Sequence, residues 1–213
     1  MAEETNSSRE NIRICIPLEL YYAEELKALI SQSYQDLNLT IEWHVLPVNR
    51  CVMMVSQGIL DADIGRSPVV TTKYPNLVSV PVQLFSADVN LYSLAPPDDP
   101  VPDPQTLLSD HRYRVAYPSH LLHVRNMAAS HSTLGADSAD QMIALLRKGR
   151  VDYILISATE AEKMENNGKA MTGLYQIQKA YIRIPGHHIL NRKHEGLAAE
   201  LAKGFRQRLE TPD

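Results

Sequence analysis

The stretch QGILDADIGRSPVVTTKYP, from Gln57 to Pro75, carries the strongest indication of the fold. A helix is expected to end at Gly58, and a short strand, LDADIG, follows it directly. This strand ends at Gly65 and presents Arg66 on a sharp exit turn, where the guanidinium offers five donors in a rigid fork that suits a carboxylate. Two interpretations are open: Arg66 binds an anionic group of a ligand, or it pairs with the nearby Asp63 at a surface turn.

Length and composition indicate a globular protein. The 213 residues are enough for one large domain or for two small lobes, and 44% of them are apolar. The net charge of −4, without a block of lysines or arginines, argues against a nucleic-acid surface. The longest apolar runs, such as YILIS at 153–157, are of strand length and fall well short of the ~18 residues that cross a bilayer.

Strand and helix patterns alternate along the chain, which predicts an α/β fold. The first part shows strands at 11–17, 39–47 and 60–65, with helices at 21–37 and 50–58. Asn49 is the expected cap of the second of these helices. The later part repeats the pattern, with strands at 113–118, 132–136 and 151–157 and helices at 119–130, 138–149 and 158–168. Units of this size normally form a parallel sheet.

Two long extended segments divide these parts. Residues 76–96 form an extended run that we interpret as too long for one strand of a compact sheet, and a proline-rich loop follows at 95–104. Residues 174–185 alternate like a long strand, and 194–210 form a final helix. The pattern therefore predicts lobe 1 at 11–87 and 182–213 and lobe 2 at 88–181. In such an arrangement the ligand is expected in the cleft between the lobes, at the carboxyl ends of the strands.

The two cysteines, Cys15 and Cys51, do not make a disulfide framework. Cys15 alternates with isoleucines in the first strand and Cys51 begins an apolar helix, so each is interpreted as a small buried hydrophobic residue. A single bridge between them stays open, although their spacing does not favour it. No metal site is expected, because no ligand spacing with a cysteine or carboxylate is seen around His111, His187, His188 and His194.

The order of these elements resembles that of the type II periplasmic-binding proteins. More narrowly, GILDADIGRSP…YPNLVSVP, LSDHRYRVAYPSH and DSADQMIALLRKGRVDYILIS resemble the amino-acid-type substrate-binding domains of transporters, the family 3-like extracellular solute-binding proteins. The helix–turn–Asp–strand pattern of ALLRKGRVDYIL repeats that of VSQGILDADIG, and the matching order extends from Asn11 to about Leu209. The resemblance implies two Rossmann-like lobes joined by two extended hinge crossings, a Venus flytrap that closes on a small ligand without a cofactor.

The resemblance also implies where a ligand would bind. In lobe 1 the positions lie at the end of the third strand and in the loop after the first strand. In lobe 2 they lie at the hinge, at a helix start whose free N–H groups favour anions, and at a strand end. Arg50 and Arg125 are weaker anchors, expected on solvated helix faces. The expected ligand-binding residues are Arg66, Ser67, Glu19, Tyr21, Tyr22, Ser86, Tyr92, Ser119, His120 and Ser157.

The chain departs from the family pattern in two places. Where the family has a Thr or Ser and an Arg at a helix start, VVTTKYP offers Thr71, Thr72 and Lys73, and the arginine comes directly after Gly65. The first loop, PLELYY, lacks the family's small-Pro-Pro-aromatic pattern. The expected ligand class is therefore broad: a small polar or anionic metabolite, such as an amino acid or a small carboxylate.

Three functions are compared on this basis. The preferred one is non-catalytic binding of such a metabolite for transport or sensing, with a membrane permease or a sensor as partner. The alternatives are an enzyme on the same scaffold, such as a cyclic-acid dehydratase with Glu19 or His120 as general base, and a sensor or docking module with a degenerate cleft. A nucleophile–base pair or metal set at a telling spacing is not seen. We expect a monomer without catalytic residues, cofactor, metal or nucleic-acid partner.

The start of the chain bears on where the protein works. MAEETNSSREN is polar and has no apolar core, so no signal peptide is expected in the chain as given. The chain is then either cytosolic or the mature form of an exported protein. The family resemblance favours the second, which predicts a periplasmic or extracytoplasmic location.

Overall fold

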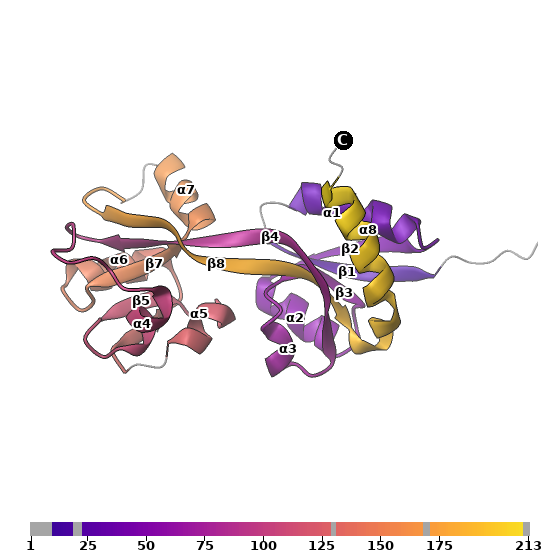
Figure 1. The fold of residues 1–213 in the computed structure, drawn as a ribbon, viewed down its shortest axis with the longest axis horizontal. Helices are drawn as coiled ribbons and strands as arrows, with labels where there is room; N and C mark the ends of the chain where they lie inside the picture. Colours follow the sequence, from indigo (N-terminus) through magenta and orange to yellow (C-terminus); the bar gives the residue numbers. More distant parts are fainter. Residues whose placement is uncertain (1–9, 19–22, 129–130, 168–170, 211–213) are drawn as a thin grey trace, which may run out of the picture. The chain divides into compact units, whose positions relative to one another are not determined.

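The computed structural model describes residues 10–18, 23–128, 131–167 and 171–210 (Figure 1). The chain forms two compact units: unit 1 combines Met1–Phe85 with Pro185–Asp213, and unit 2 is Ser86–Ile184. Within the described ranges, no helix is long and apolar enough to span a membrane.

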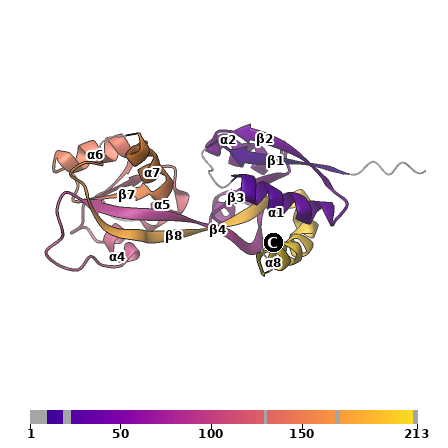
Figure 2. The same cartoon turned by 90° about the horizontal axis from the view of Figure 1, so that it is seen from above.

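Unit 1 is built on a sheet with helices on both faces. The strand β1 (Asn11–Pro17) pairs in parallel with β2 (Thr40–Leu46) and with β3 (Ala62–Arg66), and β3 pairs antiparallel with β8 (Tyr175–Asn191). Helices α1 and α8 lie on one face and α2 on the other (Figures 1 and 2). The helical elements are α1 (Ala23–Gln35), α2 (Val48–Ser56), α3 (Val70–Lys73), the 3-10 helix η1 (Arg192–Leu197) and α8 (Ala198–Glu210).

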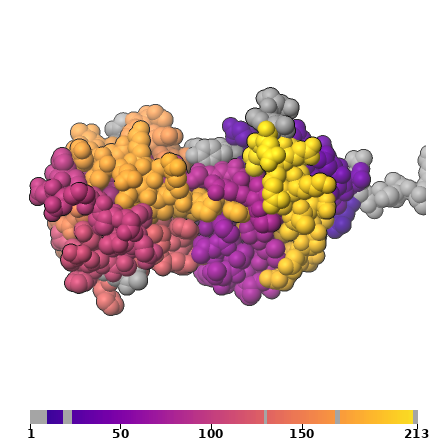
Figure 3. Space-filling view, viewed as in Figure 1, coloured from indigo at the N-terminus to yellow at the C-terminus, as the bar shows by residue number. Residues whose placement is uncertain are grey.

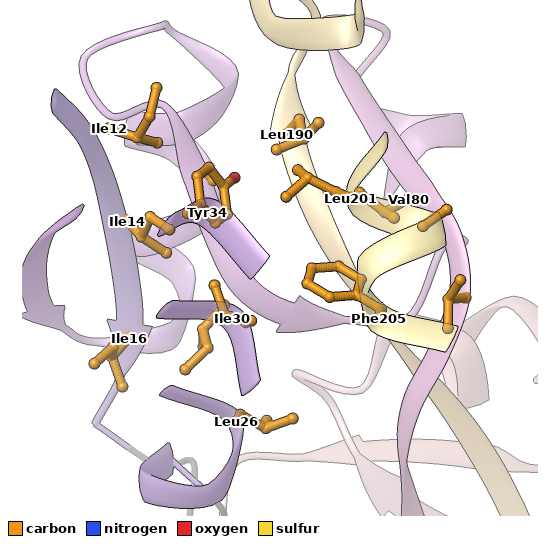
Figure 4. Close-up of a cluster of buried hydrophobic side chains, with 14 residues drawn as sticks. Ile12, Ile14, Ile16, Leu26, Ile30, Tyr34, Val80, Leu190, Leu201 and Phe205 are labelled. Carbon is orange, nitrogen blue, oxygen red and sulfur yellow. The ribbon is translucent and has the colours of Figure 1, made fainter. Parts of the chain in front are cut away.

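The larger core of unit 1 lies between the sheet and helices α1 and α8. Alternate residues of β1 face it, and α1 contributes residues spaced four apart, which is the helical period predicted from the sequence. Helix α8 lies on the surface of the unit (yellow in Figure 3) and buries one stripe against the sheet. Figure 4 shows these side chains together: Ile12, Ile14 and Ile16, then Leu26, Ile30 and Tyr34, then Leu201 and Phe205.

One buried polar pair interrupts this core. The Tyr34 hydroxyl lies 2.9 Å from Nε2 of His188, and Nδ1 of His188 lies 3.3 Å from the Ile64 carbonyl. Because a carbonyl can only accept, Nδ1 donates to Ile64, and in the neutral imidazole Nε2 then accepts from the Tyr34 hydroxyl. Both side chains are fully buried. Burial lowers the pKa of His188 to about 4, although its backbone hydrogen bonds act against the shift.

The opposite face of unit 1 corrects the interpretation of the cysteines. Cys15 of β1 and Cys51 of α2 form a disulfide with their Cα atoms 5.6 Å apart. Both residues are fully buried in a second apolar cluster with Val55 and Ile189. The prediction that they lie in the core therefore holds, but the bridge that their spacing did not favour is present.

Unit 2 repeats the design of unit 1. The strand β7 (Tyr153–Ser157) pairs in parallel with β5 (Val115–Pro118), β5 pairs in parallel with β6 (Thr133–Ala136), and β4 (Leu77–Ser93) pairs antiparallel with β7. Successive residues of β7 alternate between two cores: Ile154 and Ile156 face α6 and α7, whereas Leu155 faces α4 and α5. The helices are α4 (Pro104–Ser109), α5 (Leu122–Met127), α6 (Ala139–Arg147) and α7 (Ala158–Asn166).

The strands β4 and β8 are each 17 residues long and contribute to both units. The full strand order is β2-β1-β3-β8-β4-β7-β5-β6, with these two strands as central neighbours. Residues 76–96, interpreted as too long for one strand of a compact sheet, contain the single strand β4, which begins in unit 1 and ends in unit 2. A strand limit taken from compact sheets does not apply where one strand passes from one core into another.

Helix ends agree with the sequence in some places and differ in others. Ser138 caps α6 by accepting from the Gln141 amide, and Gly58, just beyond α2, has the left-handed conformation (φ +74°) expected after a helix. The expected cap Asn49 was wrong: it lies inside α2, which starts after Pro47 without a side-chain cap. The helix end expected at Gly168 falls outside the described residues.

Candidate functional site

The end of β3 holds Arg66 in a local bulge. Asp63 lies opposite Ile189 of β8 and Arg66 lies opposite His187, so three steps on β3 match two on β8. A bulge of this kind turns the following side chain relative to a regular strand. The Asp63 carboxylate closes it: Oδ1 accepts from the Gly65 amide at 3.1 Å, and Oδ2 accepts from Nε of Arg66 at 2.6 Å.

A second contact fixes the far end of the guanidinium. Nη2 of Arg66 donates to the Val48 carbonyl at 2.5 Å, which ties the end of β3 to the first turn of α2. The Arg66 side chain keeps only 15% of its surface exposed, and the Asp63 side chain keeps 1%. Burial raises the pKa of Asp63, although the Arg66 guanidinium and the Gly65 amide oppose the shift. Within the described part of the chain, Nη1 of Arg66 has no hydrogen-bond partner.

An aromatic ring packs against the same turn. A Cβ atom placed on Gly65 would lie 2.4 Å from the Phe85 ring, and one placed on Gly186 of β8 would lie 2.2 Å from it. Only glycine leaves room for the ring at these two positions, because real Cβ atoms do not approach other atoms so closely. Phe85 therefore covers the backbone beside Arg66, and this contact was not predicted from the sequence.

These contacts decide part of the question about Arg66. The ion pair with Asp63 is present, but it is largely buried rather than at an exposed surface turn. The ion pair with Asp63 uses Nε, and the Val48 carbonyl takes one Nη2 hydrogen, so these contacts do not use every donor of the guanidinium. Ligand binding by Arg66 stays a prediction.

The neighbouring Asp61 has a structural role. Its buried carboxylate accepts from Nε of Arg13 at 2.9 Å, from Nζ of Lys193 at 2.6 Å and from Nε2 of His194 at 3.2 Å. Burial acts to raise the pKa of Asp61, but these hydrogen bonds outweigh it and hold the pKa far below its usual value. Asp61 thus links β1 and η1 at the start of β3, whereas Asp63 forms the ion pair with Arg66.

Of the other site residues predicted in unit 1, only Ser67 lies within the described residues. Glu19, Tyr21 and Tyr22 lie outside the described residues. Ser67 is half-buried directly after β3, and its carbonyl accepts from the Val70 amide at 3.1 Å.

In unit 2 the predicted hydroxyls make local contacts. Ser86 donates to Asp88 at 3.0 Å, and Ser157 caps α7 by accepting from the Glu160 amide at 3.3 Å. Ser157 ends β7, as predicted. Whether these residues contact a ligand stays a prediction.

The helix start expected at Ser119 and His120 was wrong. Helix α5 begins at Leu122, because the Ser119 amide donates to the Ala136 carbonyl and extends the pairing of β5 with β6. The Ser119 hydroxyl donates to Asp137 at 2.7 Å, and His120 is exposed. With only six residues, α5 does not provide the anion-binding helix start that was expected.

Tyr92 lies in one of the cores of unit 2. It is 3% exposed and packs with the α6 side of unit 2. Its hydroxyl accepts from the side-chain amides of Asn90 at 3.3 Å and Gln176 at 3.2 Å. Asn90 also accepts from the amide of Ala180, a non-glycine residue with φ +47°, at 2.9 Å. These hydrogen bonds form a polar network that joins β4 to β8, and the ligand contact expected at Tyr92 stays a prediction.

Two further observations concern other kinds of site. Among the described residues, no cluster of three or more histidine, cysteine or carboxylate side chains could hold a metal ion.

A pocket of about 270 Å³ lies at the start of β7, lined by Leu94, Leu146, Asp152 and Tyr153 among others. The predicted ligand-binding residues do not line it.

Comparison with known proteins identifies the fold of the chain. No protein-family model matches the chain, and no curated protein matches its sequence. Among solved structures, the chain is similar to a histidine kinase sensor domain with similarity to periplasmic binding proteins. The TM-score is 0.65 at 14% identity, over 95% of this chain and 91% of that one.

Two binding proteins are similar over comparable lengths. An ancestral arginine-binding protein bound to glutamine matches with a TM-score of 0.61 at 14% identity, over 95% of this chain and 93% of that one. The probable amino-acid ABC transporter extracellular-binding protein from Bacillus subtilis matches with a TM-score of 0.64 at 10% identity, over 95% and 93%. The chain therefore has the type II periplasmic-binding-protein fold, which confirms the predicted fold class.

Proposed function

We propose that this protein binds a small metabolite that carries a carboxylate, without catalysis, for transport or sensing. The observation that supports the proposal is Arg66. It ends β3, is held by Asp63 and Val48, and keeps its Nη1 atom unpaired among the described residues. In open α/β sheets, ligands bind outside the carboxyl ends of the strands, which is where Arg66 lies. The expected position of the ligand between the two lobes stays a prediction.

The comparisons support binding rather than catalysis. The neighbouring structures are binding proteins and a sensor domain, and one of them is an ancestral arginine-binding protein bound to glutamine. The dehydratase alternative relied on Glu19, which lies outside the described residues, and on His120, which is exposed. Sensing is kept beside transport because the histidine kinase sensor domain is among the neighbours.

An extracytoplasmic location is part of the proposal. A neighbour is described as an extracellular-binding protein, and the Cys15–Cys51 disulfide fits an oxidising compartment. A structural disulfide of this kind is rare in cytosolic proteins of mesophiles.

A thermal-shift screen tests the proposal. The purified protein is heated with each amino acid and with small carboxylates such as acetate and succinate. A compound at one hundred times its Kd stabilises the folded state by about 2.7 kcal/mol. For a chain of this size that raises the Tm by roughly 5–10 °C.

Arg66→Ala is the matched variant. One charge-assisted hydrogen bond contributes about 1.5–3 kcal/mol, so the variant should weaken binding by about tenfold or more while it stays folded. Arg150→Ala, at an exposed position of unit 2 that is not among the predicted anchors, is the control and should bind as the wild type does. The absence of any stabilising compound, or full affinity in Arg66→Ala, would contradict the proposal.

A further inference from the structure

The positive charge of Arg66 is paired with the negative charge of Asp63 in the protein without a ligand. Both oxygens of the Asp63 carboxylate act as acceptors, one from the Gly65 amide and one from Nε of Arg66, which is the bonding pattern of the ionised form. Asp63 is 1% exposed and Arg66 is 15% exposed on its side chain, so water screens this pair poorly. The pair therefore has almost no net charge, although its guanidinium still has donors to offer.

The contacts with Asp63 and Val48 determine which N–H donors of the Arg66 guanidinium remain for a ligand. Nε is taken by Asp63, and Nη2 gives one hydrogen to the Val48 carbonyl. Nη1 and the second hydrogen of Nη2 are left among the described contacts. A ligand carboxylate can therefore accept from Nη1, whereas the Nε donor is closed to it.

We infer that Asp63 determines the ligand specificity of this site. It restricts the ligand carboxylate to the Nη1 donors of Arg66, and it offsets the guanidinium charge so that the site favours a carboxylate-bearing ligand without net charge over its anionic analogue. The inference rests on the proposed function and adds to it the charge class of the ligand and the residue that sets it.

The matched amides and acids of two amino acids test this inference. L-glutamine and L-glutamate have nearly the same shape and differ by one negative charge at neutral pH, as do L-asparagine and L-aspartate. Affinities are measured by isothermal titration at pH 7.5 for the wild type, for Asp63→Asn and for Arg66→Ala. The ratio of amide to acid affinity within each pair is the readout, because a general loss of packing weakens both members alike.

Asp63→Asn removes one buried negative charge and keeps the shape of the side chain. The amide-to-acid ratio should then fall by on the order of tenfold, as expected for removing the repulsion between two unit charges in a partly buried site. Asp36→Asn is the matched control. Asp36 pairs with Arg208 at 2.8 Å and is 57% exposed. It follows the 13-residue helix α1, about 20 Å along the helix from the edge where β1 ends. The amide-to-acid affinity ratio of the Asp36→Asn variant should equal that of the wild type.

A second measurement does not depend on the variant folding. In wild-type protein labelled with nitrogen-15, the Arg66 Nε–H should exchange slowly with water and should not shift when glutamine binds. The Nη hydrogens should shift.

The outcomes separate the two claims. If a probe binds and Arg66→Ala abolishes binding, but the ratio is the same in Asp63→Asn, the role of Asp63 is wrong and the proposed function stands. An Nε–H that exchanges at the solvent rate, or that shifts on binding, also overturns the role of Asp63. If neither member of either pair binds the wild type, the charge inference is overturned together with the amino-acid form of the proposed function.

Discussion

Acidification should destabilise unit 1 through His188. The imidazole is fully buried, donates to the Ile64 carbonyl and accepts from Tyr34, so protonation would place a charge among Tyr34 and Phe205 and remove its acceptor. Its pKa falls from 6.5 to about 4 on folding. The unfolded chain therefore binds more protons than the folded one between these values, and stability is lost as the pH falls through this window.

The size of the effect follows from the two pKa values. At pH 5 the free energy of unfolding should be about 2 kcal/mol lower than at pH 8, and below pH 4 the loss approaches about 3 kcal/mol. Asp61 contributes in a different window, because its pKa is held low in the folded state and its stabilisation is lost only at stronger acidity. Burial also lowers the pKa of His123 and raises the pKa of Asp63, so the share of His188 is taken as the difference between the wild type and a variant that lacks this imidazole.

Urea unfolding at pH 8, 6 and 5 measures this effect. The wild type is compared with His188→Gln, whose amide can still donate to Ile64 and accept from Tyr34, and with His111→Gln, where the side chain is 89% exposed. His188→Gln should lose most of the pH dependence, and His111→Gln should keep it. An equal slope in the wild type and His188→Gln would refute the reasoning.

The remaining predictions concern the packing of unit 1. Replacing Cys15 and Cys51 by alanine, or reducing the bridge, should lower the free energy of unfolding by about 4 kcal/mol. The reason is that the bridge closes a loop with a sequence separation of 36. An unchanged urea midpoint after reduction would contradict this prediction. Gly186→Ala should cost about 1–3 kcal/mol because its methyl group would meet the Phe85 ring. Adding Phe85→Ala should recover part of that loss, and strict additivity in the Tm values would exclude the contact.

Much of the fold could be predicted because its signals are local. The periodicity of α1, the alternation of β1 and the Ser138 cap all depend on residues close in sequence. The two long extended segments were also visible in the sequence, although β8 continues to Asn191, six residues beyond the end that was expected at Pro185. The helix expected at 119–130 is present as α5, but it starts three residues later than predicted, because the Ser119 amide donates to the carbonyl of Ala136, a partner 17 positions away.

The site was predictable only in part. An aspartate three residues before Arg66 at a strand end indicated the ion pair, and that pair is present. The Val48 carbonyl carries no side-chain signal, so its contact with Arg66 could not be predicted. The disulfide was missed for a physical reason: a separation of 36 residues says nothing about the 5.6 Å that the packing of α2 on β1 imposes between the two Cα atoms.

The division of the chain between the two units also orders its folding during synthesis. Unit 2 is one continuous segment and can close its cores once residue 184 has emerged. Unit 1 lacks Leu190, Leu201 and Phe205 until the end of the chain is made, so the apolar faces of α1 and β1 stay uncovered for longer. Cys15 and Cys51 both lie in the early segment, and their bond can hold α2 against β1 during that interval. The last helix thus completes the part of the protein that is synthesised first.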